Sequence, residues 1–292
     1  MTRHRNLPGI AALVGAAALF SLMDAGMKLL SPFYPAMQVT ALRSLASLPL
    51  VYVYVAWRGR QASLLRIRWP LHLLRGAIGV AMLWLFIVGL RQLPMTETYS
   101  IFFIAPLLIT GLSAPLLGER VGRARWLAII AGFIGVLVVL RPTGQGMLTW
   151  AGLAILGSAL CYTVSALTIR IAGRTDSTES LMFWLITMLA GGSALLALPG
   201  WQAVRPQDYW LIGAIGVSGF FGQLGVTYAF QHGEASAVAP FEYTALGWGV
   251  LLDRLLWHTS PDRYTLLGAS IIIASGWYLV RREKIHSEAE HP

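Results

Sequence analysis

The sequence predicts an all-α integral membrane protein with ten transmembrane helices. They are arranged as two inverted-topology five-helix repeats, with both termini in the cytoplasm. Three observations predict this fold: an apolar composition, ten apolar segments of spanning length, and a weak internal repeat. The chain has 292 residues, of which 56% are hydrophobic and only 12% are charged, and its mean hydropathy is +0.64. A soluble domain of this size needs more polar surface, so the solvent is a lipid bilayer.

The elements follow from segment length. A membrane-spanning helix needs roughly 20 apolar residues, and Pro, Gly and charged residues divide the chain into segments of about that length. These segments are 8–30, 35–57, 70–90, 96–117, 124–141, 149–171, 179–199, 208–230, 236–257 and 263–281. The basic start and first apolar run resemble a signal peptide, but no convincing cleavage site follows, so we expect a retained first helix.

The distribution of Lys and Arg predicts the orientation. One alternate set of loops, which includes both termini, carries Arg3, Arg5, Arg58, Arg60, Arg66, Arg68, Arg120, Arg123, Arg125, Arg170, Arg174, Arg281, Arg282 and Lys284. The other set carries only Lys28, Arg91, Arg141, Arg205, Arg254 and Arg263. Cations favour the cytoplasmic side, so both termini are predicted there. This asymmetry explains the net charge of +9 better than nucleic-acid binding does.

Two alignments of the chain with itself predict the repeat. A shift of 140 positions lays 105–132 over 245–272, and a shift of 142 lays the first segment over the sixth. The predicted repeats are 1–144 and 145–292, the second ending in a short cytoplasmic tail. Because each contains five helices, the second copy enters the membrane from the opposite side. Inverted repeats of this kind are typical of carriers with alternating access.

Two stretches of sequence resemble a known family. The segment "LSAPLLGERVGRARWLAIIAGFIGVLVVLRP" (112–142) resembles the signature of the drug/metabolite transporter superfamily, in its EamA-type ten-helix branch. The segment "EASAVAPFEYTALGWGVLL" (234–252) is similar to the start of the family's ninth helix, although "LWHTSPDR" replaces the expected "LGE". Because Thr259 stands where the second half would carry the matching Glu, no partner in the repeat supports a role for Glu119.

Within the superfamily, the aromatic content and layout resemble YddG-type aromatic amino acid exporters. This resemblance implies export of aromatic and other neutral amino acids through the inner (cytoplasmic) membrane of a bacterium.

Charged residues inside apolar segments are candidate functional groups, since a charge in hydrocarbon is costly unless it is paired or hydrated. In "SLMDAGMKLL" (21–30), Asp24 lies four residues before Lys28, and the hairpin brings Arg43 level with Asp24. Either Asp24 forms an ion pair with one of these cations that merely neutralises itself, or Asp24 or Arg43 faces a water-filled cavity. In the second case the pair binds the ammonium or carboxylate of a substrate, or Asp24 takes a coupling proton. Glu242 is a further candidate acid facing the cavity.

Aromatic residues in the middle of segments are candidates for the substrate path. Trp84, Trp184 and Trp248 lie too deep for an interfacial belt. They either face lipid and core or line a path for planar substrates, because aromatic rings offer stacking area and Tyr adds a hydroxyl. The other members of such a lining are Phe20, Tyr99, Phe102, Phe103, Tyr162, Phe220 and Tyr243.

Small residues and prolines suggest packing and gating positions. Glycines recur at every third position from Gly213 to Gly225, which fits either close helix packing or a cavity with Gln223 as its hydrogen-bonding group. Pro106 and Pro115 in the fourth segment and Pro240 in the ninth interrupt backbone hydrogen bonds. We therefore expect these two helices to bend during gating.

Several functional classes are excluded. The sequence contains no H-E-x-x-H, G-x-S-x-G or Walker A motif, and one cysteine, Cys161, allows neither a disulfide nor a thiolate metal site. We therefore expect no enzyme activity, no cofactor and no metal, but a secondary transporter that acts as a monomer on a small molecule. One alternative is a proton-coupled exporter of drugs or hydrophobic cations that uses Asp24 or Glu242. The other is a non-transporting membrane enzyme or scaffold.

Overall fold

A computed structural model describes residues 7–59, 64, 67–105, 107–109, 112, 123–140, 149–172, 176–232 and 239–290. All the regular structure in these residues is helical. In the part of the chain that the structure describes, six helices are long and apolar enough to cross a membrane: Pro8–Leu30, Ala36–Trp57, Trp69–Gln92, Trp150–Thr168, Glu179–Gly200 and Pro206–Val226. Shorter apolar helices in the described residues are Met95–Phe102 and Trp126–Val139. The all-helical membrane class is confirmed, whereas the count of ten spans stays a prediction.

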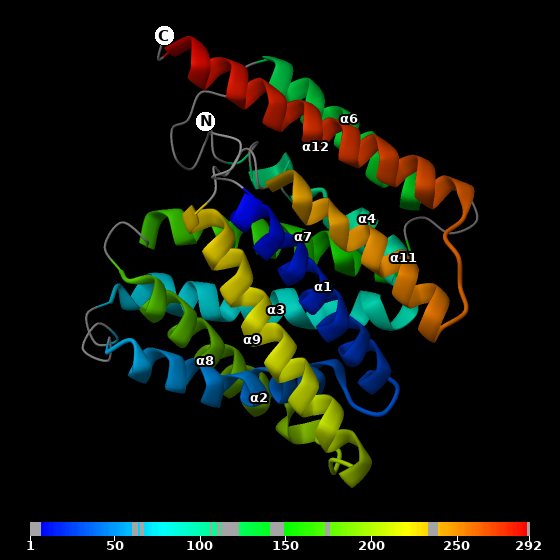
Figure 1. Ribbon diagram of the computed structural model, residues 1–292. Helices are drawn as coiled ribbons and strands as arrows, with labels where there is room; N and C mark the ends of the chain where they lie inside the picture. The colour runs from blue at the N-terminus through cyan, green and yellow to red at the C-terminus, as the bar shows by residue number, and fades with distance from the viewer. Residues whose placement is uncertain are drawn as a thin grey trace. The chain divides into compact units, whose positions relative to one another are not determined.

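Most helices follow the predicted segments, although α4 (Met95–Phe102) ends well before the predicted end of the fourth segment at 117; the helices are labelled in Figure 1. They are α1 (Leu7–Leu30), α2 (Ala36–Trp57), α3 (Trp69–Gln92), α4 (Met95–Phe102), α6 (Arg123–Leu140), α7 (Trp150–Ala172), α8 (Thr178–Ala197), α9 (Tyr209–His232), α11 (Thr244–Leu256) and α12 (Arg263–Glu290). The described residues also form the short 3₁₀ helices η2 (Leu198–Gly200), η3 (Pro206–Asp208) and η4 (Ala239–Tyr243). The boundaries of α1, α2, α3, α6, α7, α8 and α9 agree with the prediction to within two residues.

The last two predicted segments differ from the structure in informative ways. The ninth consists of η4 followed by α11, and Pro240, which has no backbone N–H to donate, lies in the 3₁₀ part. The tenth continues past 281 to Glu290 as part of α12. Residues 282–290 are rich in Arg, Glu, Lys and Ala, which favour a helix although they are too polar for a bilayer core.

The chain forms two compact units that do not coincide with the predicted repeats. Unit 1 comprises Met1–Ser21, Leu93–Leu156 and Phe221–Pro292, and unit 2 comprises Leu22–Gln92 and Gly157–Phe220. In unit 1, α4 packs on α11 and α6 on α12. In unit 2, α8 packs on α2 and α3. The pairs α2/α8, α4/α11 and α6/α12 each join helices at corresponding positions of the two predicted repeats.

Glycines allow close helix packing within both units. In unit 2, a Cβ on Gly216 of α9 would lie 2.5 Å from the Cβ of Ala46 on α2. In unit 1, a Cβ on Gly268 of α12 would lie 2.5 Å from the carbonyl oxygen of Gly135 on α6. Both distances are shorter than real Cβ contacts, so these positions require glycine. At Gly216 the glycine run therefore serves close packing.

At the N-terminal end of α2, side chains join two distant loops of unit 2. The Gln38 amide donates to the carbonyl of Gln202 at 2.6 Å and accepts from its backbone N–H at 2.8 Å. The Tyr34 hydroxyl donates to the Asp208 carboxylate and accepts from the backbone N–H of Arg205 at 3.1 Å. Arg205 Nε donates to Asp208 at 2.8 Å, and this bond raises the pKa of the Arg205 guanidinium. We call this set the first junction.

A second junction lies at the C-terminal end of α2. His72 Nε2 lies 2.9 Å from Asp176 Oδ2, which also accepts from the backbone N–H of Arg68 at 3.2 Å. Arg58 Nε lies 3.8 Å from Glu179 Oε1. The first junction joins the turn before α2 to the loop before α9. The second joins the turn before α8 to the loop before α3, so the two occupy equivalent places in the predicted repeats.

In unit 1, a carboxylate from α11 caps the start of α4. Asp253 is 1% exposed and accepts from the backbone N–H groups of Met95 and Thr96 at 2.9 and 2.8 Å. It also accepts from the Thr96 hydroxyl at 2.8 Å. The first N–H groups of a helix have no partner within the helix, and in an apolar interior they must find one elsewhere. Asp253 therefore fixes α4 to α11.

We expect Asp253→Ala to lower the thermal unfolding temperature of the purified protein, because three donors lose a charged acceptor. The free-energy cost should be at least about 2 kcal/mol. Unfolding in detergent, followed by tryptophan fluorescence, measures it. Arg254→Ala is the matched control, since Arg254 is the exposed neighbour and its removal should leave the transition unchanged. Equal unfolding temperatures for the two variants would contradict the capping role.

Candidate functional site

Two opposite charges lie together inside the spans of unit 2. Asp24 on α1 is buried, and Arg43 on α2 is half-buried. Asp24 attracts the Arg43 guanidinium electrostatically, and Arg43 Nε donates to the sulfur of Met23 at 3.0 Å. A thioether sulfur is a weak acceptor. The guanidinium therefore has a counter-charge in Asp24 but a poor hydrogen-bond partner in Met23.

Helix α9 borders this charge pair. A Cβ on Gly219 would lie 2.9 Å from the Met23 sulfur and 3.9 Å from Arg43 Nε. The missing side chain at Gly219 leaves room for the guanidinium between α1, α2 and α9. The predicted proximity of Asp24 and Arg43 is thus present in the structure, and the geometry suits either an ion pair or a binding point for a zwitterion.

Three predicted aromatic residues come together in unit 1. The rings of Tyr99 and Phe103 are stacked with centroids 6.2 Å apart, and Phe103 meets Tyr243 edge to face at 5.1 Å. Tyr99 belongs to α4, Phe103 directly follows it, and Tyr243 ends η4. Tyr243 also packs against Gly276 of α12. We call Tyr99, Phe103 and Tyr243 the aromatic cluster, and Glu242, which is half-buried, precedes its third member.

The other candidates of unit 1 lie on α1, α4, α9, η4 and α11. The half-buried candidates are Phe20 on α1, Phe102 on α4 and Trp248 on α11. The Phe20 ring lies against Gly222, where a Cβ would be 3.1 Å from two of its carbons. Gln223 on α9 is exposed. Pro240 lies in η4, while Pro106 and Pro115 fall outside the residues that the structure describes.

The aromatic candidates of unit 2 have separate surroundings. Trp184 on α8 meets Trp69 with ring centroids 4.6 Å apart and donates from Nε1 to the carbonyl of Leu64 at 2.8 Å. Phe220 is buried and meets Tyr54 edge to face at 6.1 Å. The remaining two are partly exposed: Trp84 on α3 to 38% and Tyr162 on α7 to 37%.

Sequence reasoning missed two buried ionisable side chains in unit 2. Arg75 on α3 is 2% exposed and His72 on the same helix is 1% exposed. The sequence did contain a signal for Arg75. Of the 22 Lys and Arg residues in the chain, only Arg43 and Arg75 belong to neither of the two loop sets. His72 precedes Arg75 by three residues, so both lie on one face of α3. Asp253 was missed as well, and its partner Met95 is too distant in sequence for any local pattern to reveal it.

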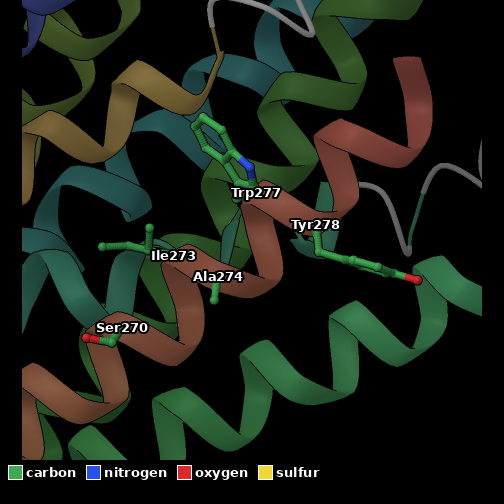
Figure 2. A pocket seen from close by; sticks show the side chains of 5 residues that line it. All are labelled: Ser270, Ile273, Ala274, Trp277 and Tyr278. Atoms are coloured by element: carbon green, nitrogen blue, oxygen red, sulfur yellow. The ribbon is translucent and has the colours of Figure 1, made fainter. Parts of the chain in front are cut away.

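A hollow on α12 in unit 1 does not qualify as a substrate site. Figure 2 shows the side chains that line it, Ser270, Ile273, Ala274, Trp277 and Tyr278, which all project from one helix. None is charged, and the polar atoms do not converge on a common point. Among the described residues, no group of three His, Cys, Asp or Glu side chains is placed to hold a metal ion.

Comparison with known proteins identifies the family. The model of the EamA-like transporter family matches residues 7–141 and again 149–281. The chain therefore belongs to the EamA-like transporter family, and it carries the family's repeat twice.

Two relatives and one solved structure extend this assignment. A riboflavin transporter of Vibrio cholerae is 28% identical over 295 residues, covering 99% of this chain and 98% of its own. A pseudopaline exporter, CntI, of Pseudomonas aeruginosa is 27% identical over 285 residues, covering 94% and 97%. A crystal structure with a TM-score of 0.67 and 20% identity covers 96% of this chain and 98% of its own, and it supports the fold.

These comparisons confirm the predicted family and class. The protein is a membrane transporter and not an enzyme, in agreement with the sequence prediction. Neither relative is named as an amino acid exporter, so the comparisons lend no support to that part of the resemblance.

The Asp24–Arg43 pair can be tested by changing one or both charges. Asp24→Asn alone leaves Arg43 without its counter-charge and should cost about 3 kcal/mol or more, seen as a lower unfolding temperature. Asp24→Asn combined with Arg43→Gln should recover stability. If the pair binds substrate, the double variant folds but does not transport.

Two results sharpen this test. Arg91→Gln is the matched control, because Arg91 is exposed at the end of α3 and its loss should change neither stability nor flux. A double variant that transports at the wild-type rate would show that the pair merely neutralises itself.

Proposed function

We propose that the protein is a secondary transporter that moves a small planar aromatic metabolite across the bacterial inner membrane by alternating access. The observation that carries this proposal is the similarity to the Vibrio cholerae riboflavin transporter, which extends over 99% of this chain and 98% of that protein. A match of that extent includes every helix that could line a substrate path. Riboflavin is therefore the first substrate to test.

The aromatic cluster of unit 1 supports a flat substrate. Tyr99, Phe103 and Tyr243 supply aromatic area and two hydroxyl groups, and the ring pairs at 5.1 and 6.2 Å hold the three rings in defined orientations. Metabolite sites usually combine such apolar area with a few polar groups. Glu242, next to Tyr243, supplies one such group.

The charge pair of unit 2 supports a second candidate, the aromatic and other neutral amino acids. Asp24 and Arg43 offer one negative and one positive group close together inside the spans. These charges match the ammonium and the carboxylate of an amino acid. A fixed pair of opposite charges selects a zwitterion over a simple cation, so the pair favours amino acids over the hydrophobic cations of a drug exporter.

Alternating access is supported by the repeated architecture. The family model matches once on each side of the proposed boundary between 1–144 and 145–292. The packed pairs α2/α8, α4/α11 and α6/α12, and the equivalent junctions at the two ends of α2, are what two-fold related halves would produce. Such halves give two conformations of similar energy, open to opposite sides. The proline-containing η4 is a point at which the ninth helix can bend.

The orientation and assembly follow the same proposal. The Lys and Arg bias supports a cytoplasmic location for the N- and C-termini. Each repeat finds its partner within one chain, so a monomer suffices. The sequence contains no nucleotide-binding motif that could power the transport cycle. The gradient of the metabolite, or of a coupled proton, therefore sets the direction of transport. The predicted export follows when the metabolite is more concentrated inside.

Flux into proteoliposomes tests the proposal. Vesicles containing the purified protein should take up labelled riboflavin, or labelled Phe or Trp, with saturation and with inhibition by the same compound unlabelled. Protein-free vesicles are the control, and each flux is measured with and without a pH gradient. Absence of flux for all three compounds would contradict the proposal. Uptake of hydrophobic cations alone, driven by the pH gradient, would favour a drug exporter.

A further inference from the structure

Unit 2 contains a buried guanidinium that has one weak hydrogen-bond partner among the residues that the structure describes. Arg75 on α3 is 2% exposed. Its Nη1 donates to the carbonyl of Leu181 on α8 at 3.4 Å, a long hydrogen bond, and its Nε has no hydrogen-bond partner among the described residues. The two acids at the start of α8 have other partners, Asp176 with His72 at 2.9 Å and Glu179 with Arg58 at 3.8 Å.

The neighbours of Arg75 form an ordered row along α3. His72 lies one turn before it, with Nε2 on Asp176 and with Nδ1 unpartnered among the described residues. Trp69 lies one further turn back, and its ring meets that of Trp184 on α8. We call Trp69, His72, Arg75 and Trp184 the α3–α8 cluster. The cluster contains two indole rings, an imidazole and a guanidinium.

Among the described residues, no anion or set of acceptors compensates the burial of Arg75. A buried cation is costly unless an anion or several acceptors compensate it, and a single long bond to a carbonyl compensates little. The side chain cannot snorkel to lipid headgroups, because only 2% of it is exposed. An apolar residue of similar volume would pack between α3 and α8 without this cost. A charged group retained under these conditions inside a membrane protein points to a ligand.

We propose that the α3–α8 cluster is a recognition site for a carboxylate-bearing aromatic group of the transported metabolite. Arg75 binds the carboxylate through its fork of N–H donors, and Trp69 and Trp184 contact the ring. Trp69 is 43% exposed and marks the side from which the ligand reaches the cluster. The proposal rests on the proposed function, and within it selects carboxylate-bearing substrates such as the aromatic amino acids.

Paired probes that differ only in charge test the site on the full-length protein in detergent. 3-Phenylpropionate and its neutral amide, 3-phenylpropionamide, are titrated while tryptophan fluorescence is recorded. We expect saturable binding of the carboxylate and much weaker binding of the amide. Arg75→Gln should weaken carboxylate binding at least tenfold and leave amide binding unchanged. Arg75→Lys, which keeps the charge but loses the fork, should fall between them, and Trp184→Phe should reduce the fluorescence change.

The controls separate this inference from a structural role and from the proposed function. Arg91→Gln, on the same helix but exposed, should bind both probes as the wild type does. Should Arg75→Gln fail to fold, the carboxylate-to-amide ratio of Arg75→Lys decides the question. A folded variant, Arg75→Gln or Arg75→Lys, with the wild-type ratio overturns the inference. Arg75-dependent carboxylate binding by a protein that transports none of the candidate substrates leaves the site standing and overturns the proposed function.

Discussion

The structure depends on one constraint: polar groups and charges inside a bilayer must find their partners within the protein, because hydrocarbon offers none. The buried acids meet this requirement in three ways. Asp253 is satisfied by the backbone N–H groups that begin α4, Asp176 by His72, and Asp24 by the charge of Arg43. The contacts of Asp253 and Asp176 join segments that are distant in sequence, whereas Asp24 and Arg43 join the consecutive helices α1 and α2.

The same constraint separates structural charges from functional ones. Asp253 accepts hydrogen bonds from three donors, and these bonds explain its burial by its structural role of holding α4 to α11. Arg43 combines a counter-charge with a sulfur acceptor, and Arg75 has one long bond to a carbonyl. Arg43 on α2 and Arg75 on α3 are therefore the cations to which a substrate can supply the hydrogen-bond acceptors that the protein lacks.

The sequence predicted the bounds of most spans well but did not indicate which candidate side chains come together, for a physical reason. Hydrophobic thickness sets the length of a spanning segment, so local composition sufficed to place α1 to α3 and α6 to α9 within two residues. Helix rotation depends on packing, which local composition does not encode. Phe103 and Tyr243 meet in unit 1, while Trp84 and Tyr162 are partly exposed, although all four looked equivalent as mid-span aromatics. Hairpin geometry correctly brought Asp24 near Arg43. The Asp253 cap joins residues more than 150 positions apart and could not be foreseen.

The central claim is that two inverted copies of one five-helix repeat form this transporter. Trp57 and Leu198 are at the equivalent ends of α2 and α8 and are both well exposed, so inversion puts them on opposite sides of the membrane. Single cysteines at these positions, in a Cys161→Ala background, can be probed in cells with a maleimide that does not cross the inner membrane. The account predicts that Leu198→Cys is labelled from outside, and Trp57→Cys only after the inner membrane is permeabilised. Labelling of both from the same side would contradict it.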